Sequence, residues 1–129
     1  MISLGRGSYY NVVVVGELAF KFPIKKEKMI KPKNLAKMYD ELRDIVGILP
    51  ATYHEEYGEQ YFVQPKAKGK KMSEMDVDKQ LHKEFIEWKH QLESECRKRG
   101  YVARDLSKKN VYYDGKSFQV VDIERFEYA

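Results

Sequence analysis

The chain carries near its start the stretch YYNVVVVGELAFKF, residues 9–22, which is rich in β-branched and aromatic side chains. Such residues favour strands, and Gly16 with Glu17 provides a two-residue connection between two of them. Because a connection this short joins antiparallel strands, the sequence predicts a β-hairpin, which Pro23 ends.

The next segments predict one helix and a second hairpin. Apolar residues at helical spacing predict a helix over residues 34–46, which Gly47 stops. The shared face of this helix carries Leu35, Met38, Leu42 and Ile45. The basic stretch 25–33 before it is expected to be a loop. After it, PATYHEE and EQYFVQP predict two strands around a turn at Tyr57 and Gly58.

A long helix and a short hairpin complete the pattern. The polar run KAKGKK at 66–71 is expected to be a solvated connector, and Ser73 with Asp76 resembles the capping box of a helix that runs to Arg99. That helix carries an apolar stripe, interpreted as core, of Leu81, Phe85, Trp88, Leu92 and Cys96. Strands near NVYY and SFQVV follow, joined by a tight turn at residues 114–115. This order of strands and helices predicts an α+β fold.

Length and composition set the remaining limits. The chain has 129 residues, which predicts one domain. Cys96 is the single cysteine, so no internal disulfide can form, and a reducing, cytoplasmic location is expected. No stretch approaches the ~18 apolar residues of a membrane helix, and the start lacks the regions of a signal peptide. A formal net charge of +4 agrees with a phosphate-bearing ligand and is too small to indicate nucleic acid.

Three features of the first part of the chain suit a phosphate ligand. Gly5 and Gly7 let backbone N–H groups approach phosphate oxygens, although turn glycines are the simpler interpretation. Lys21 lies in a strand that reads as half-buried, where a lysine needs an anionic partner or a route to water. Glu41 flanks the apolar face of the first helix, so it can either reach over the sheet to Lys21 or remain an exposed helical glutamate.

A fourth feature lies near the end of the chain. In ARDLSKKN, Asp105 and Asn110 have the spacing D-x-x-x-x-N, and Asp122 follows an apolar strand. Mg²⁺ prefers hard oxygen ligands and is usually held by one or two carboxylates together with substrate phosphates. One carboxylate and one amide as ligands, with a second carboxylate able to accept a proton, suit phosphoryl transfer.

Taken in order, these features resemble the eukaryotic-type protein kinases over nearly the whole chain. The resemblance implies an antiparallel N-lobe sheet with one helix, then a long helix, a catalytic loop and a terminal hairpin, with a truncated C-lobe. It implies a minimal kinase-like protein of bacterial or viral type. Residues 1–129 would form a single domain, with an N-lobe-like part over 1–65, a hinge and connector over 66–75, and a reduced C-lobe over 76–129.

The resemblance also implies roles for the matched residues. Lys21 would hold the α and β phosphates of ATP, positioned by Glu41. Asp105 would orient the acceptor hydroxyl or take its proton. Asn110 and Asp122 would bind Mg²⁺ or Mn²⁺. The implied nucleotide-binding positions are Gly5, Gly7, Val12, Ala19, Lys21, Glu41, Gln64 and Lys66.

Several positions depart from the kinase pattern. Tyr10 stands where a third glycine is common, and Ala103 replaces the histidine of H-R-D. Ser107 takes the place of the phosphate-contacting lysine, and Lys108 is expected to substitute for it as a catalytic residue. Glu124 replaces the glycine of D-F-G, and the resulting DIE is similar to the aspartate-x-glutamate of choline and aminoglycoside kinases.

The predicted function is that of an ATP-dependent phosphotransferase of protein kinase type, acting on Ser or Thr or on itself, with a protein as substrate or partner. Only seven residues follow Asp122, too few for an activation segment or a helical lower half. This departure favours the alternative of a pseudokinase, which would bind nucleotide or act as a scaffold that regulates a protein partner. A small-molecule kinase of the choline or aminoglycoside type is a third alternative, favoured by Glu124 alone.

Overall fold

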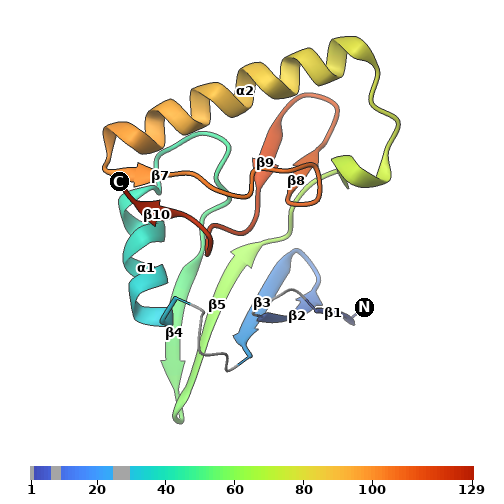
Figure 1. Ribbon diagram of the computed structural model, residues 1–129. Helices are drawn as coiled ribbons and strands as arrows, with labels where there is room; N and C mark the ends of the chain where they lie inside the picture. Colours follow the sequence, from blue (N-terminus) through green and yellow to red (C-terminus); the bar gives the residue numbers. More distant parts are fainter. Residues whose placement is uncertain (1, 7–9, 25–29) are drawn as a thin grey trace. The chain divides into compact units, whose positions relative to one another are not determined.

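The computed structural model contains helices and antiparallel sheets, so the predicted α+β class is confirmed (Figure 1). The described residues are 2–6, 10–24 and 30–129. The chain forms two compact units: unit 1 is Met1–Asp40 with Pro50–Lys66, and unit 2 is Glu41–Leu49 with Ala67–Ala129. Residues 41–49 thus belong to the same compact unit as residues 67–129. The two units therefore cannot be separated by a single cut in the sequence.

Unit 1 contains a five-stranded antiparallel sheet in the order β1-β2-β3-β5-β4. Its strands are β1 (Ile2–Arg6), β2 (Tyr10–Val15), β3 (Leu18–Pro23), β4 (Thr52–Glu56) and β5 (Glu59–Pro65). The first predicted hairpin is confirmed, because Val15 pairs with Leu18 across the Gly16–Glu17 turn. The second is confirmed as well, and its turn residues Tyr57 and Gly58 have φ values of 50° and 78°. Two positive φ values are typical of the type I′ turn that suits a twisted hairpin.

The two faces of this sheet differ. On one face Phe62 is buried, and its ring contacts those of Tyr10, Tyr39 and Tyr53 at centroid distances of 6.0, 5.8 and 5.4 Å. Tyr39 comes from α1 (Pro32–Glu41), so the helix packs against this face. Tyr10 is thus a core residue of unit 1. On the other face, Tyr61 stacks against half-buried rings: His54 at 5.2 Å and Phe22 at 5.6 Å.

The first helix differs from its prediction over residues 34–46. It begins at Pro32, where proline suits the first turn of a helix, and it ends at Glu41. The chain then continues in turns, in which the Ile45 N–H donates to the carbonyl of Leu42 at 3.1 Å. Leu42 and Ile45 are buried all the same. The apolar spacing therefore correctly predicted that Leu42 and Ile45 are buried, but it did not distinguish an α-helix from tighter turns.

Unit 2 is built around α2 (Lys79–Lys98), the long predicted helix. The predicted capping box is wrong, because Ser73 lies in the 3-10 helix η1 (Met72–Glu74) and α2 begins later. Asp78 is the N-cap, and its Oδ1 accepts a hydrogen bond from the Leu81 N–H at 2.8 Å. In the predicted apolar stripe, Phe85, Leu92 and Cys96 are buried, and Leu81 and Trp88 are half-buried.

Two small sheets complete unit 2. The predicted terminal hairpin is confirmed as β8 (Val111–Tyr113) and β9 (Phe118–Val120). A third strand, β6 (Lys70–Lys71), pairs with β8. It lies in the segment 66–71, for which the sequence predicts a loop. Gly69 makes this pairing possible, because a Cβ there would lie 2.0 Å from the carbonyl oxygen of Tyr113. The second sheet pairs β7 (Tyr101–Val102) with β10 (Glu127–Tyr128).

The core of unit 2 forms between α2 and the β6-β8-β9 sheet. Its buried members are Met72, Phe85, Val111 and Phe118. The inserted segment 41–49 joins this unit through β9, since the Val120 N–H donates to the Gly47 carbonyl at 2.7 Å and the Leu49 N–H donates to the Val120 carbonyl at 3.0 Å. Within the described ranges, the helices are too short or too polar for any of them to cross a lipid bilayer.

Candidate active site

The β8–β9 hairpin of unit 2 brings the two predicted metal ligands to one end. Asn110 immediately precedes β8, and Asp122 lies two residues beyond β9. Val111 pairs with Val120, so Asn110 and Asp122 both lie at the open end of the hairpin, opposite its turn. Both side chains are half-buried. The antiparallel register explains why Asn110 and Asp122, twelve positions apart in the sequence, lie at the same end of the hairpin.

The loop between Asp105 and Asn110 is closed by hydrogen bonds. The Asn110 side-chain Nδ2 donates to the Asp105 carbonyl at 2.9 Å and to its Oδ2 at 2.7 Å. The Asn110 backbone N–H also donates to the Ser107 carbonyl at 3.0 Å. Asp105 has a φ of 62°, a left-handed conformation that aspartate tolerates better than most residues. We call this arrangement the Asp105–Asn110 clasp; its hydrogen bonds fix the orientation of the Asp105 carboxylate in this loop.

Two basic residues flank the clasp in different ways. The Arg125 Nε lies 3.5 Å from Asp105 Oδ2, and the two side chains are 52% and 43% exposed. Lys108, the predicted phosphate-contacting lysine, is half-buried, and its carbonyl accepts a hydrogen bond from the Ser73 N–H at 3.0 Å. Besides Asn110, the Asp105 carboxylate thus has a second neighbour, Arg125, which the sequence analysis did not predict. An exposed ion pair of this kind contributes about 0–1 kcal/mol to stability.

In unit 1, four of the predicted nucleotide-binding residues share one face of the sheet. Val12 pairs with Lys21, and Ala19 pairs with Gln64, so their side chains point to the same side of the pleat. This is the face that also carries Phe62, the partner of Lys21 in β5. Lys21 and Gln64 are the buried polar side chains of the described chain, with exposures of 6% and 2%.

The remaining unit 1 positions are less fully defined. Gly5 lies in β1 and pairs with Val12, so its backbone lies next to this face. Gly7 lies outside the described residues. The Lys66 N–H donates to the carbonyl of Glu17 at 2.8 Å, so this N–H is already used within unit 1, and the predicted contact of Lys66 with a nucleotide would involve its carbonyl or its side chain.

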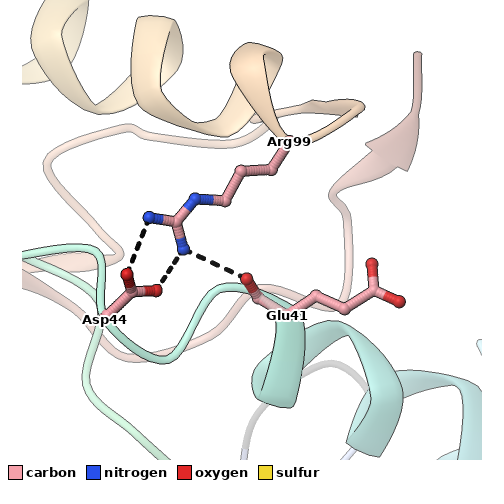
Figure 2. A network of polar contacts seen from close by, with 3 residues as sticks. All are labelled: Glu41, Asp44 and Arg99. Atoms are coloured by element: carbon pink, nitrogen blue, oxygen red, sulfur yellow. Dashed lines mark hydrogen bonds and ion pairs between the residues drawn. The ribbon is translucent and has the colours of Figure 1, made fainter.

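Glu41 is the last residue of α1 and belongs to unit 2. Two other residues of unit 2 contact it, one at its backbone carbonyl (Figure 2) and one at its carboxylate. Arg99 donates to the Glu41 carbonyl at 3.1 Å and forms a bidentate pair with Asp44, with Nη2 2.9 Å from Oδ2. In Figure 2 the Glu41 carboxylate extends away from Arg99. The hydroxyl of Tyr101 donates to Oε2 of this carboxylate.

The charges and burial around Glu41 shift the pKa of its neighbours. The hydrogen bond from Arg99 lowers the pKa of the Asp44 carboxyl, and the same bond raises the pKa of the Arg99 guanidinium. Burial raises the pKa of the Tyr101 phenol far above its ordinary value, and the hydrogen bond to Glu41 adds to this rise. Tyr101 therefore remains a protonated donor at any physiological pH.

The predicted site residues thus fall into two groups. Unit 2 holds Asp105, Lys108, Asn110, Asp122 and Glu41, and unit 1 holds Gly5, Val12, Ala19, Lys21, Gln64 and Lys66. The pairing of Lys21 with Glu41, which joins the two groups, stays a prediction. The sequence interpretation missed Arg99, Tyr101 and Arg125, whose partners lie 20 to 60 residues away along the chain. No local spacing signals such contacts.

The donor set at the hairpin end fits a magnesium ion. An amide oxygen from Asn110 and a carboxylate from Asp122 are hard ligands, and the clasp uses the nitrogen of Asn110 rather than its oxygen. In the part of the chain that the structure describes, no three His, Cys, Asp or Glu side chains gather as a metal site. A magnesium ion that keeps water and phosphate ligands needs no such cluster.

Comparison with known proteins supports the fold. No family model matches the chain, and no curated protein matches it in sequence. The chain is similar to the solved structure of the Cydia pomonella granulovirus kinase PK-1, with a TM-score of 0.71 and 16% sequence identity. The match covers 98% of this chain and 53% of that kinase, so the chain spans about half its length. The chain therefore has a protein kinase-like fold, as the sequence predicted.

Proposed function

We propose that this protein is an ATP-dependent phosphotransferase of the protein kinase type. The observation that carries the proposal is the Asp105–Asn110 clasp at the end of the β8–β9 hairpin, with Asp122 beside it. The clasp holds one carboxylate while the amide oxygen and a second carboxylate suit a metal ion. A kinase-like fold supports assigning this arrangement to phosphoryl transfer.

In this proposal each residue has a chemical task. The Lys21 ammonium binds the α and β phosphates of ATP, and Glu41 orients that lysine. Val12 and Ala19 line the nucleotide face of the sheet. Asp105 accepts the proton of the acceptor hydroxyl while the acceptor oxygen bonds to the γ-phosphorus and the bond from that phosphorus to the β–γ bridging oxygen breaks, which releases ADP. A magnesium ion held by Asn110 and Asp122 would neutralise phosphate charge.

The acceptor class follows from the same proposal. A hydroxyl of Ser or Thr, in a protein partner or in this chain itself, suits a carboxylate base such as Asp105. Incubation with γ-labelled ATP and Mg²⁺, followed by mapping of labelled residues, identifies the acceptor.

The first test measures ATP affinity with and without Mg²⁺. Wild-type protein is expected to bind ATP more tightly with Mg²⁺, and Asp122→Ala is expected to lose that metal-dependent gain because it removes one hard ligand. Asp76→Ala is a matched control, since Asp76 is an exposed carboxylate that precedes α2. Equal affinities with and without metal for the wild type would contradict the assignment.

The second test separates catalysis from binding. Asp105→Asn keeps the size of the side chain but removes its basic oxygen. We expect ATP binding to remain and phosphoryl transfer to fall by about 100-fold or more, the usual contribution of a general base. Transfer at the wild-type rate would show that Asp105 is not the base.

A nucleotide-binding regulator without catalysis is the second candidate. The ion pair between Arg125 and Asp105 favours it, because a guanidinium beside the proposed base competes with an acceptor for the same oxygen. The Glu124 side chain near Asp122 is a further departure from active kinases. Metal-dependent ATP binding without transfer to any acceptor, unchanged by Asp105→Asn, would establish this candidate instead.

A further inference from the structure

Unit 2 gathers lysines on the segment that precedes η1 and on the loop that precedes β8. The sequence predicts the run KAKGKK at 66–71 to be a solvated connector, for which charges are usual. In the structure, Lys70 and Lys71 instead form β6, which pairs with β8. Lys68 is tied to the same sheet, because its N–H donates to the side-chain oxygen of Gln119 at 3.5 Å. This part of the run is therefore ordered on unit 2.

Two further lysines lie in the loop that the Asp105–Asn110 clasp closes. Lys108 is half-buried and Lys109 is exposed. The Ser73 N–H of η1 donates to the Lys108 carbonyl at 3.0 Å, and η1 follows β6 directly. This hydrogen bond and the pairing of β6 with β8 bring both groups of lysines to one region of unit 2. We call these residues the basic strip: Lys68, Lys70, Lys71, Lys108 and Lys109.

The basic strip has no acidic partner within the described ranges of the chain. None of its ammonium groups forms an ion pair there, although the exposed acids Glu74 and Asp76 follow shortly in the sequence. Like charges held close together repel one another, and lysine is depleted in strands. Gly69 nevertheless holds the segment against β8, since a Cβ there would collide with the Tyr113 carbonyl oxygen. An anionic partner would remove the cost of this arrangement.

The position of the basic strip favours an acidic protein segment as that partner. Two of its lysines lie between Asp105, the proposed base, and Asn110, so a segment bound to the strip reaches the proposed catalytic loop. The acceptor hydroxyl of the proposed function belongs to a protein, and carboxylates are the anions that a protein segment supplies. Nucleic acid is less favoured, because the formal net charge of the whole chain is only +4.

We propose that the basic strip binds an acidic segment of the protein that carries the acceptor hydroxyl, with Asp or Glu side chains of that segment on its lysines. The inference rests on the proposed function for the role of the bound protein as acceptor, whereas the binding surface lies entirely in unit 2. The strip then selects among acceptors: a Ser or Thr near several acidic residues binds more tightly than one without them.

Fluorescence anisotropy at low ionic strength tests the binding. The probes are a labelled peptide with one Ser among Glu residues and the same peptide with Gln at every Glu position. We expect wild-type protein to bind the Glu peptide more tightly, and added NaCl to weaken that binding by screening the charges. In the test variant, Lys70→Gln, Lys71→Gln and Lys109→Gln are combined. We expect it to bind the Glu peptide about tenfold more weakly, the size expected for three exposed ion pairs.

A second triple variant is the matched control. Lys33→Gln, Lys79→Gln and Lys83→Gln remove the same charge from exposed positions of α1 and α2, and wild-type affinity for the Glu peptide is expected. Equal losses in the two triple variants would reveal an effect of net charge alone and overturn the inference. Equal affinities of the wild type for the Glu and Gln peptides would overturn it too. Tighter binding of a single-stranded oligonucleotide of the same charge would overturn it in favour of nucleic acid.

Transfer from γ-labelled ATP to the Glu peptide separates this inference from the proposed function. We expect the test variant to raise KM for the peptide about tenfold and to leave kcat and KM for ATP unchanged, since the strip binds the acceptor equally in the ground and transition states. A variant that lowers kcat alone would overturn the inference while the proposed function stands. If the strip binds the peptide but no acceptor is ever labelled, the proposed function fails, and only the binding of an acidic segment stands.

Discussion

At the scale of single residues, Asp105 has an unfavourable backbone conformation that a neighbouring side chain stabilises. Its φ of 62° is unfavourable for a side chain with a Cβ, and Asn110 offsets that cost by donating to both its carbonyl and its carboxylate. The spacing of the two residues was visible in the sequence, but the conformation was not. Strain held in place by a neighbouring side chain is common at functional sites, and here it fixes the proposed base.

Cys96 gives a prediction at the same scale. Burial raises the pKa of its thiol from 9.0 to about 11. The unfolded chain therefore releases this proton at a lower pH than the folded protein, and stability falls as the pH rises from the unfolded pKa through the folded one. We expect the urea midpoint of wild-type protein to decline more steeply between about pH 9 and 11 than that of Cys96→Ala. Parallel declines would show that the thiol is accessible to water in the folded state.

At the scale of elements, the ends of helices were harder to place than their faces. The apolar stripe of α2 was read correctly, but its start was assigned to Ser73 and Asp76 when Asp78 is the cap. Several oxygen-bearing side chains precede this helix, and only the one at the N-cap position can accept a hydrogen bond from the first free backbone N–H groups. Likewise α1 ends at Glu41 although its apolar spacing continues, because turns bury Leu42 and Ile45 equally well.

The cap of α2 can be tested directly. Asp78→Ala removes the acceptor of the Leu81 N–H and is expected to destabilise the protein by about 1 kcal/mol. Asp76→Ala, which changes a nearby exposed aspartate, is expected to change stability by less than about 0.5 kcal/mol. Chemical denaturation of both variants provides the measurement. A larger loss for Asp76→Ala would restore the capping box that the sequence suggested.

At the scale of the whole molecule, the chain does not divide at one point. Residues 41–49 leave unit 1 after α1, pack in unit 2 and return to begin β4. Gly47 lies where this segment meets the aromatic core: its φ is 104°, and a Cβ there would lie 2.7 Å from the Trp88 Nε1. Trp88 in turn packs against Phe118 at 5.4 Å. A residue from the first half of the sequence thus completes the core of the second.

Gly47→Ala is therefore expected to destabilise unit 2. Gly115→Ala is the matched control, since Gly115 has a similar φ of 99° with no atom near its added Cβ. Both variants pay about 1–2 kcal/mol for the backbone conformation, and overpacking against Trp88 adds about 1–3 kcal/mol at Gly47 alone. Urea denaturation followed by tryptophan fluorescence measures the difference. Equal losses in the two variants would mean that segment 41–49 is not packed on Trp88.

The sequence by itself determined the local elements and the polar pattern. The three hairpins, the apolar stripe of α2 and the D-x-x-x-x-N spacing depend on interactions between residues close in the chain, and spacing records such interactions. On that basis the α+β class was predicted correctly, and the resemblance to the protein kinases correctly implied a kinase-like fold.

Only the tertiary structure decided the long-range contacts. The short strands β6, β7 and β10 contain two residues each, so they exist because a partner strand is present, not because of their own pattern. The contacts of Arg99 and Tyr101 with Glu41, and of Arg125 with Asp105, join residues that packing brings together. Loop closure and packing depend on the whole chain at once, so no local spacing records which distant side chains will meet.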